Sequence, residues 1–141
     1  MKKIIIITVF ITSLLFPWGK TGHRITGEVA EAHLTEKAKI EIAKILSDPS
    51  LANASTWADE MRPNPDFQKY STWHYANMPL DKRYSEHPQS KKGDIVQAIK
   101  LCKAKLKNPN VSKNEKAFHL RFLVHLVGDI HQPLHVGRED D

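Results

Sequence analysis

The sequence feature that most constrains the fold is the stretch HLVGDIHQPLH at residues 125–135. His125 and Asp129 are four residues apart in a helical run, so their side chains share one helix face. Pro133 ends that helix, and His135 follows in the exit loop. Two imidazoles and a carboxylate that converge in this way suit a borderline metal such as zinc. The alternative is a helix end with a few partly buried histidines, which is favoured for any one of these residues taken alone.

Helical periodicity dominates the rest of the chain, and no segment alternates convincingly as a strand does. A capping-box sequence, Ser112 to Glu115, opens the helix that carries the motif. The other predicted helices cover 22–34, 35–48, 55–61 and 93–106. Between them we expect an irregular loop through 66, an extended segment or short turn at 71–76, and a polar loop at 80–92. The predicted fold class is therefore all-α.

Residues 1–17 have the pattern of a signal peptide. The basic start MKK is followed by a largely apolar run of 13 residues. That length suits a secretory segment and is too short for a membrane span, which needs about 20 residues. Leu15 and Pro17 occupy positions where small residues favour cleavage before Trp18, so an uncleaved, membrane-retained form is one alternative. A buried core strand is the other alternative for this segment. We expect a secreted or periplasmic protein.

Residues 18–141 are long enough for one modest domain. The chain stops just past the motif, with no further helix to cover its apolar helix faces. We therefore expect the N-terminal part of a single, truncated domain whose C-terminal helices are missing.

Charge and cysteine content narrow the classes of function. Without the two leader lysines, 19 basic and 16 acidic side chains remain, a net charge of +3. That is no nucleic-acid signature by itself. The one cysteine, Cys102, cannot form an internal disulfide, and its apolar helical setting predicts a small core residue. The 8 histidines exceed what packing needs and bring metal or acid–base chemistry into consideration.

Two further segments could supply metal ligands. After cleavage, Trp18 would offer its free amine and its carbonyl oxygen as a chelate for a metal ion, which His23 could also bind. Taken alone, Trp18 is better explained as a core residue and His23 as a histidine near a helix start. His74 lies between Trp73 and Tyr75, so it is either a satisfied core histidine or a rigidly held ligand. Core packing is preferred for Trp73.

Asp59 and Arg62 sit three residues apart at the end of the short predicted helix. A carboxylate with a guanidinium beside it suits a phosphate substrate, because arginine is shaped to bind phosphate oxygens. A surface ion pair is the likelier reading of this pair alone.

Other polar residues near these segments have less specific patterns. Tyr75 could stack on a nucleobase and Asn77 could bond its edge, although Tyr75 could equally be a core residue. Three histidines lack partners at ligand spacing and are predicted to lie at the surface or on a helix face: His33, His87 and His119. His131 is predicted to support the ligands or to lie at the surface.

In chain order, these residues resemble the zinc nucleases of the S-one/P-one type. The matching elements are Trp18 with His23, WADEMR around Asp59 and Arg62, WHY around His74, and GDIHQPLH. The resemblance covers nearly all of residues 18–137. It implies a mostly helical bundle with metals at the bottom of a cleft. Bacterial zinc phospholipases C share that fold and the N-terminal tryptophan ligand.

The resemblance also implies three zinc ions in a complete enzyme. Asp129 would bridge two of them. The first ion would take Asp59, His74, His125 and Asp129; the second Trp18, His23 and Asp129; the third His135, with a histidine and an aspartate located beyond Asp141. The third site is therefore expected to be incomplete in this chain.

The implied activity is hydrolysis of phosphodiester bonds in single-stranded DNA and RNA to 5′-phosphate products, with 3′-nucleotidase activity, by a monomer. Asp59 and Arg62 would be catalytic, and Tyr75 and Asn77 would bind the base, although aspartate is common where Asn77 stands. No membrane partner is expected for the mature form. The alternatives are a zinc-dependent phospholipase C and a catalytically incomplete zinc-binding fragment.

Overall fold

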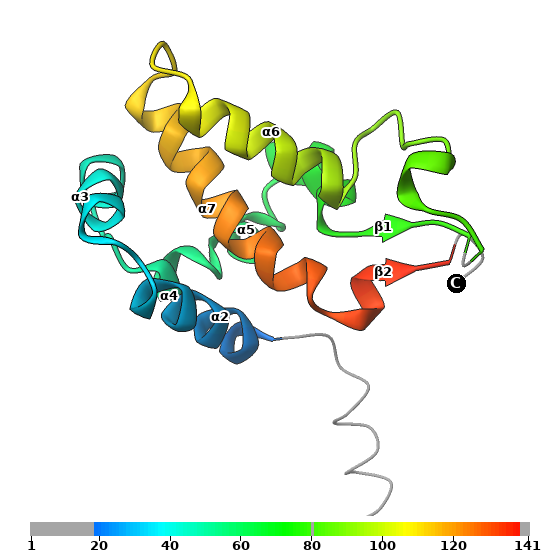
Figure 1. Cartoon of the computed structure of the whole chain (residues 1–141), viewed down its shortest axis with the longest axis horizontal. Helices are drawn as coiled ribbons and strands as arrows, with labels where there is room; N and C mark the ends of the chain where they lie inside the picture. Colours follow the sequence, from blue (N-terminus) through cyan, green and yellow to red (C-terminus); the bar gives the residue numbers. More distant parts are fainter. Residues whose placement is uncertain (1–18, 80, 139–141) are drawn as a thin grey trace, which may run out of the picture.

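The computed structural model describes residues 19–79 and 81–138. Helix α7 (Lys113–Ile130) crosses the middle of the molecule, with α6 (Ile95–Lys107) along one side (Figure 1). On its other side lie α2 (Lys20–Ala32) and α4 (Leu51–Ala54), while α3 (Glu36–Ile45) packs against the N-terminal half of α7. The predicted all-α class is confirmed.

The remaining elements are short. They are α5 (Trp57–Met61), the 3-10 helices η1 (Pro65–His74), η2 (Tyr84–Glu86) and η3 (Pro133–His135), and the strands β1 (Ala76–Asn77) and β2 (Val136–Gly137). The strands pair in parallel, with Ala76 opposite Val136. This pairing matters for the site because it holds the segment after His74 against the segment after His135.

Side-chain caps explain where several helices begin. The Ser112 side chain accepts a hydrogen bond from the Glu115 amide at 3.2 Å, which is one half of the predicted capping box. The Glu115 carboxylate instead accepts from Lys105 at 2.7 Å, and so ties α7 to α6. Asp94 caps α6 in the same way, accepting from the Gln97 amide at 3.0 Å.

The main core forms where η1 and α5 pack against α6 and α7. Phe122 is 1% exposed and is surrounded by aromatic rings, with Trp57 and Trp73 edge-on and Tyr70 tilted against it. Cys102 is completely buried in the same cluster, so the prediction that it is a core residue is confirmed, as is core packing for Trp73. This apolar cluster holds η1 against α7 and thereby fixes the position of His74 at the end of η1.

On the opposite side of α7, helix α2 approaches the chain at the start of α4 very closely. A Cβ atom on Gly27 would lie 2.5 Å from the Leu51 carbonyl oxygen, so only glycine fits there without a shift. The Glu31 carboxylate accepts from the Leu51 amide at 3.0 Å. These contacts fix α2 and bring His23 next to α7.

Three local predictions were wrong. The predicted irregular loop runs into the 3-10 helix η1, which also takes in most of the segment predicted as extended or a short turn at 71–76. The last residues of that segment are extended. A 3-10 helix has no 3.6-residue apolar repeat that would reveal it. Helix α4 was missed because four residues are too few to show periodicity. The two-residue strands were missed because their pairing joins segments about 60 positions apart.

The described residues contain no helix with the length and apolar content that a membrane span requires. The predicted signal peptide and Trp18 lie outside the described residues.

Candidate metal centre

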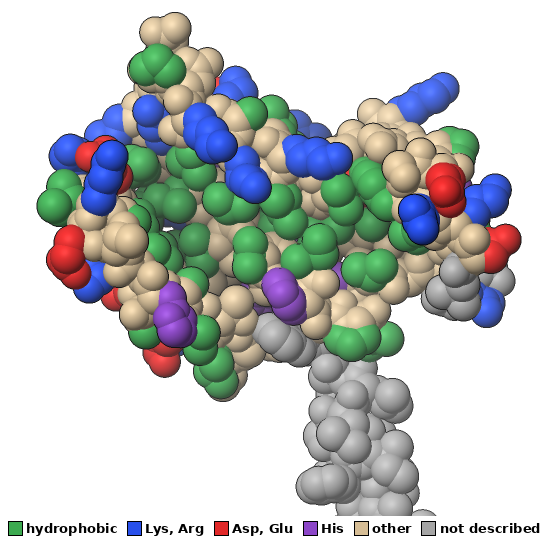
Figure 2. Space-filling model, in the orientation of Figure 1, with side chains coloured by type: hydrophobic (Ala, Val, Ile, Leu, Met, Phe, Trp, Pro, Cys, Tyr) green, Lys and Arg blue, Asp and Glu red, His purple; other side chains and the backbone are tan. Residues whose placement is uncertain are grey.

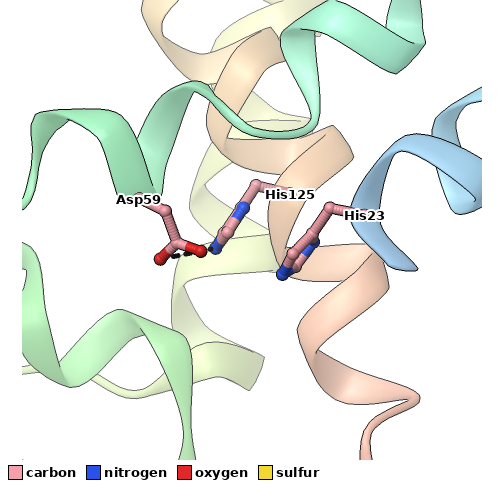
Figure 3. Close-up of side chains that lie close together, drawn as sticks. All are labelled: His23, Asp59 and His125. Carbon is pink, nitrogen blue, oxygen red and sulfur yellow. Dashed lines mark ion pairs between the residues drawn. The ribbon is translucent and has the colours of Figure 1, made fainter. Parts of the chain in front are cut away.

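Six side chains predicted as metal ligands gather beside the C-terminal half of α7. His125 and Asp129 lie one turn apart on that helix and are fully or almost fully buried. The others arrive from separate elements: His23 from α2, Asp59 from α5, His74 from the end of η1, and His135 from η3. Figure 3 shows His23, Asp59 and His125 pointing toward one another from three helices.

The Asp129 carboxylate lies at the centre of the cluster. Its Oδ2 is 3.0 Å from His125 Nε2 and 2.9 Å from His74 Nδ1. Its Oδ1 is 3.3 Å from His23 Nε2 and 3.6 Å from His135 Nδ1. Each oxygen therefore faces two imidazoles, which is the arrangement of a carboxylate able to bridge two cations.

The electrostatics of this carboxylate are unusual for a group that is 2% exposed. Burial alone would raise the pKa of Asp129, but hydrogen bonds from His125, His23 and His74 outweigh burial and hold the pKa far below its usual range. Burial would likewise lower the pKa of His125, but the neighbouring Asp129 and Asp59 raise it. The site therefore keeps a buried negative charge that requires positive charge next to it.

A backbone hydrogen bond on the side of the ring away from Asp129 fixes the orientation of His125. Its Nδ1–H donates to the Ser55 carbonyl at 2.7 Å, so the neutral ring has its lone pair on Nε2. That lone pair faces Asp129 Oδ2, and His74 Nδ1 lies 3.0 Å away. Lone pairs this close repel one another unless a proton or a metal ion lies between them. The donor set is nitrogen and oxygen only, which fits zinc.

His23 occupies its place because Gly128 has no side chain. The His23 ring stacks on His125, with centroids 4.1 Å apart and ring planes 15° apart. A Cβ atom on Gly128 would lie 2.7 Å from His23 Nδ1. That same Nδ1 is buried without a hydrogen-bond partner among the described residues. Such an orphan nitrogen is unusual and is consistent with a partner beyond the described residues.

Asp59 and Arg62 lie at the solvent side of the cluster. Asp59 Oδ1 is 3.8 Å from His125 Nε2 and 3.4 Å from Arg62 Nη1, and the Asp59 side chain is 32% exposed. Asp59 and Arg62 therefore form the ion pair that one prediction expected, and that ion pair lies at the rim of the cluster, where the other prediction expected a phosphate site. Arg62 also lines a small cavity of about 160 Å³ together with His74 and Ser71.

His135 lies beside the other ligands through the parallel pairing of β1 and β2. Its Nδ1–H donates to the His74 carbonyl at 2.6 Å. The neutral ring then has its lone pair on Nε2, the atom a further metal would need.

The described residues contain two overlapping groups with ligand atoms close enough to hold a cation. One group is His23, Asp59 and His125, and the other is His74, His125 and Asp129; within each, all ligand atoms lie within 4.8 Å of one another. His125 belongs to both groups. Trp18, the remaining predicted ligand, lies outside the described residues.

Tyr75 and Asn77, on the segment that directly follows His74, line a separate pocket of about 420 Å³. They share one side of the short extended segment, while Ala76 between them is buried on the other. Tyr75 is 40% exposed, so the alternative that it is a core residue is wrong. Tyr84, His87 and the backbone before α6 form the opposite wall.

The other histidines have different surroundings. His33 and His131 are exposed, and His131 Nδ1 donates to the Val127 carbonyl at 2.7 Å. His87 is partly buried at the Tyr75 pocket. His119 is only 6% exposed and lies 3.5 Å from the Cys102 sulfur, on the face of α7 that packs against α6. Of its two predicted positions, the helix face is therefore confirmed and the surface is wrong.

Sequence reasoning also missed two groups that shape the centre, the Ser55 carbonyl and Gly128. The carbonyl of Ser55 has no sequence signal. Gly128, in contrast, interrupts an apolar helix directly before Asp129, and a glycine inside a helix signals close approach of another group.

Comparison with known proteins places this arrangement in context. The family model described as S1/P1 Nuclease matches residues 18–141. The chain is 30% identical to Endonuclease 4 of Arabidopsis thaliana, over 96% of the chain and 50% of that relative. It is 29% identical to Nuclease S1 of Aspergillus oryzae (91% of the chain, 47% of the relative) and 30% identical to Nuclease P1 of Penicillium citrinum (84% and 47%). The chain thus spans about half the length of the curated relatives it matches.

Proposed function

We propose that this chain, which belongs to the S1/P1 nuclease family, hydrolyses phosphodiester bonds in single-stranded DNA and RNA with zinc as cofactor. The observation that carries the proposal is the Asp129 carboxylate, buried and faced on both oxygens by imidazoles. Relatives named as nucleases and endonucleases support the reaction class.

Zinc bound at such a centre would polarise a phosphoryl oxygen and supply a nucleophilic water near neutral pH. We assign the ligands as follows. Asp59, His74, His125 and Asp129 would hold one ion; Trp18, His23 and Asp129 would hold a second; His135 would contribute to a third. The mixed nitrogen and oxygen donors fit that assignment.

The chain's own residues at the rim orient the reactants. Asp59 is half-buried and reaches both His125 and solvent, so its carboxylate can accept a hydrogen bond from the attacking water and align it. Arg62 lines the small cavity beside His74, where its guanidinium can bind the non-bridging oxygens of the phosphate.

The Tyr75 pocket supports a preference for single strands. Tyr75 offers an exposed ring for stacking, and Asn77 on the same side offers an amide for the edge of the base. A base can enter only if it leaves its own stack, which a duplex resists. The same pocket next to the metal centre suits a 3′-nucleotide.

We further propose that residues 18–141 are the N-terminal part of one nuclease domain, released from a signal peptide at residues 1–17, secreted or periplasmic, and monomeric. The pattern of the leader supports export, and a free Trp18 amine would serve as a ligand.

A substrate comparison tests the proposal. The protein, cleaved before Trp18 and loaded with Zn²⁺, would be incubated with single-stranded DNA, 3′-AMP and phosphatidylcholine vesicles. We expect single-strand cleavage that leaves 5′-phosphate ends, loss of cleavage with EDTA, and loss in Asp59→Asn. Hydrolysis of lipid alone would favour the phospholipase C alternative. Zinc binding without hydrolysis of any substrate would favour the incomplete fragment.

A further inference from the structure

Helix α6 carries an unbalanced row of positive charge. Its sequence, IVQAIKLCKAKLK, holds four lysines and no acidic residue. The acidic residue that caps it, Asp94, is buried and accepts hydrogen bonds from Tyr84 and Gln97. The helix therefore presents positive charge that its own sequence does not neutralise.

Three of these lysines share one face of the helix. Lys100, Lys103 and Lys107 follow a spacing of three and four residues, and all three are exposed. None of them forms an ion pair with any residue in the described part of the chain, whereas Lys105 on another face pairs with Glu115 at 2.7 Å. We call Lys100, Lys103 and Lys107 the lysine row.

Helix α3 shows what an ordinary solvated helix of this protein looks like. It also carries three lysines, but Lys39 pairs with Glu36 at 2.8 Å and Lys44 with Glu41 at 2.7 Å. In Figure 2, red and blue side chains alternate over α3 at the left, whereas blue side chains lie over α6 in the upper part of the view. The modest net charge of the chain is thus unevenly distributed.

The lysine row begins at the Tyr75 pocket. Lys100 Nζ lies 5.8 Å from the centre of the Tyr84 ring, and Tyr84 forms part of the pocket wall. The Tyr84 hydroxyl donates to Asp94, directly before α6, at 2.8 Å. The Ile95 amide donates to the Tyr75 carbonyl at 3.1 Å. The pocket and the first turn of α6 are therefore one connected structure.

We infer that the lysine row is an extended binding site for the phosphates of a nucleic acid strand whose base occupies the Tyr75 pocket. This inference rests on the proposed function for the identity of the polyanion. From Lys100 to Lys107 the row rises about 10 Å along α6, and the long lysine side chains extend its reach to neighbouring phosphates of an extended strand. The row would hold the strand away from the cleavage point and favour long substrates over mononucleotides.

The composition of the face favours a nucleic acid over an anionic membrane. A helix that lies in a membrane surface buries a broad apolar face next to its lysines. Among the exposed α6 residues, Leu101 is the one large apolar side chain, and it is 40% exposed. The row also leads to an aromatic pocket, which suits a base and not a lipid head group.

Binding without cleavage tests the inference. EDTA removes metals and so prevents cleavage. The affinity of the protein for a fluorescent oligothymidylate of about 12 nucleotides is then measured by anisotropy over a range of salt concentrations. The test variant is Lys100→Gln/Lys103→Gln/Lys107→Gln. The matched control is Lys37→Gln/Lys39→Gln/Lys44→Gln on α3, which changes the net charge equally.

We expect the test variant to bind roughly tenfold more weakly than wild type at low salt. The slope of log affinity against log salt should fall in magnitude by about 2, because each lost phosphate contact on a single strand contributes about 0.7. The control should keep the wild-type slope, and affinity for 5′-TMP should change little in either variant.

Several outcomes would overturn the inference: no binding by wild type, equal slopes in test and control, or a selective loss of binding to phosphatidylserine vesicles with DNA binding intact. The proposed function fails in a different way. A protein that binds the strand through the lysine row but hydrolyses nothing when loaded with zinc refutes the nuclease activity and leaves the row in place.

Discussion

Two buried histidines on one helix have opposite surroundings. His119 and His125 lie six residues apart on α7, and both are 6% exposed or less. His119 contacts the Cys102 sulfur at 3.5 Å inside the helix pair α6–α7, with the Glu115 carboxylate 3.9 Å from its other nitrogen. His125 faces Asp129, His74 and Asp59 at the other end.

The two rings differ in the charge that each surrounding favours. Burial lowers the pKa of His119, and Glu115 opposes that effect only in part, so its neutral form is favoured. Burial would lower the pKa of His125 as well, but Asp129 and Asp59 reverse the direction. Burial of a histidine is therefore no sign of a metal site. The sign is a convergence of carboxylate and imidazole lone pairs on one point.

The largest predicted effect breaks the centre at Asp129. Asp129→Asn removes the charge that faces imidazoles on both oxygens, so two zinc ions should be lost or weakened together. Elemental analysis of the zinc-loaded protein would measure this. Cys102→Ala at the other buried histidine serves as control and should keep the wild-type zinc content. Loss of a single ion in Asp129→Asn would contradict the bridging role.

A matched pair of substitutions sharpens the comparison directly. His125→Ala should lose the zinc ion assigned to Asp59, His74, His125 and Asp129, because His125 Nε2 faces the Asp129 and Asp59 carboxylates in that group. His119→Ala should keep the zinc and instead lower the free energy of unfolding by about 1–3 kcal/mol, through the cavity and the lost thiol contact. Zinc content and urea denaturation measured on both variants would decide. Equal zinc loss in the two would show that the centre depends on core packing alone.

The sequence could predict much of the metal centre around His125 but not the core contact of His119. The spacing of His125 and Asp129 on a helix already implies a shared face, and the structure shows it. The contact between His119 and Cys102 depends instead on how α6 packs on α7, a tertiary relation with no local pattern. For the same reason the sequence leaves open whether His119 lies at the surface or on a packed helix face, although its neighbour at three residues, Phe122, is central to the core.

The fold shows the same division between local and tertiary signals. The beginning of α7 follows from Ser112, a local cap, and was predictable. The parallel pairing of Ala76 with Val136, which holds His135 beside His74, required knowledge of the whole fold. The role of Gly128 also depends on a distant segment, because the space it leaves is filled by His23 from α2.

A smaller effect is expected from Gly128→Ala. The added methyl group would lie 2.7 Å from His23 Nδ1, so the His23 ring must shift while His125 and Asp129 stay in place. Zinc content should fall in part, with the ion held by His23 lost first, and the helix itself should gain stability because alanine favours helix. Gly19→Ala is the control, since no atom of the described residues lies within 4 Å of its Cβ position. An unchanged zinc content in Gly128→Ala would show that His23 has room to move or is no ligand.

The smallest predicted effect concerns Cys102, which lies beside His119 in the core. Burial raises the pKa of Cys102 to about 12, so the thiol stays protonated in the folded protein at pH 8 and should react with a disulfide reagent only through unfolding. Because the folded pKa lies above the ordinary thiol value of 9.0, this group contributes stability below pH 9 that is lost as pH rises toward 12. The rate of thiol labelling should therefore follow the unfolding equilibrium in urea, and zinc should slow it only as far as zinc stabilises the folded state. Fast labelling of the folded protein would mean that the α6–α7 contact opens locally, and that His119 is less secluded than His125.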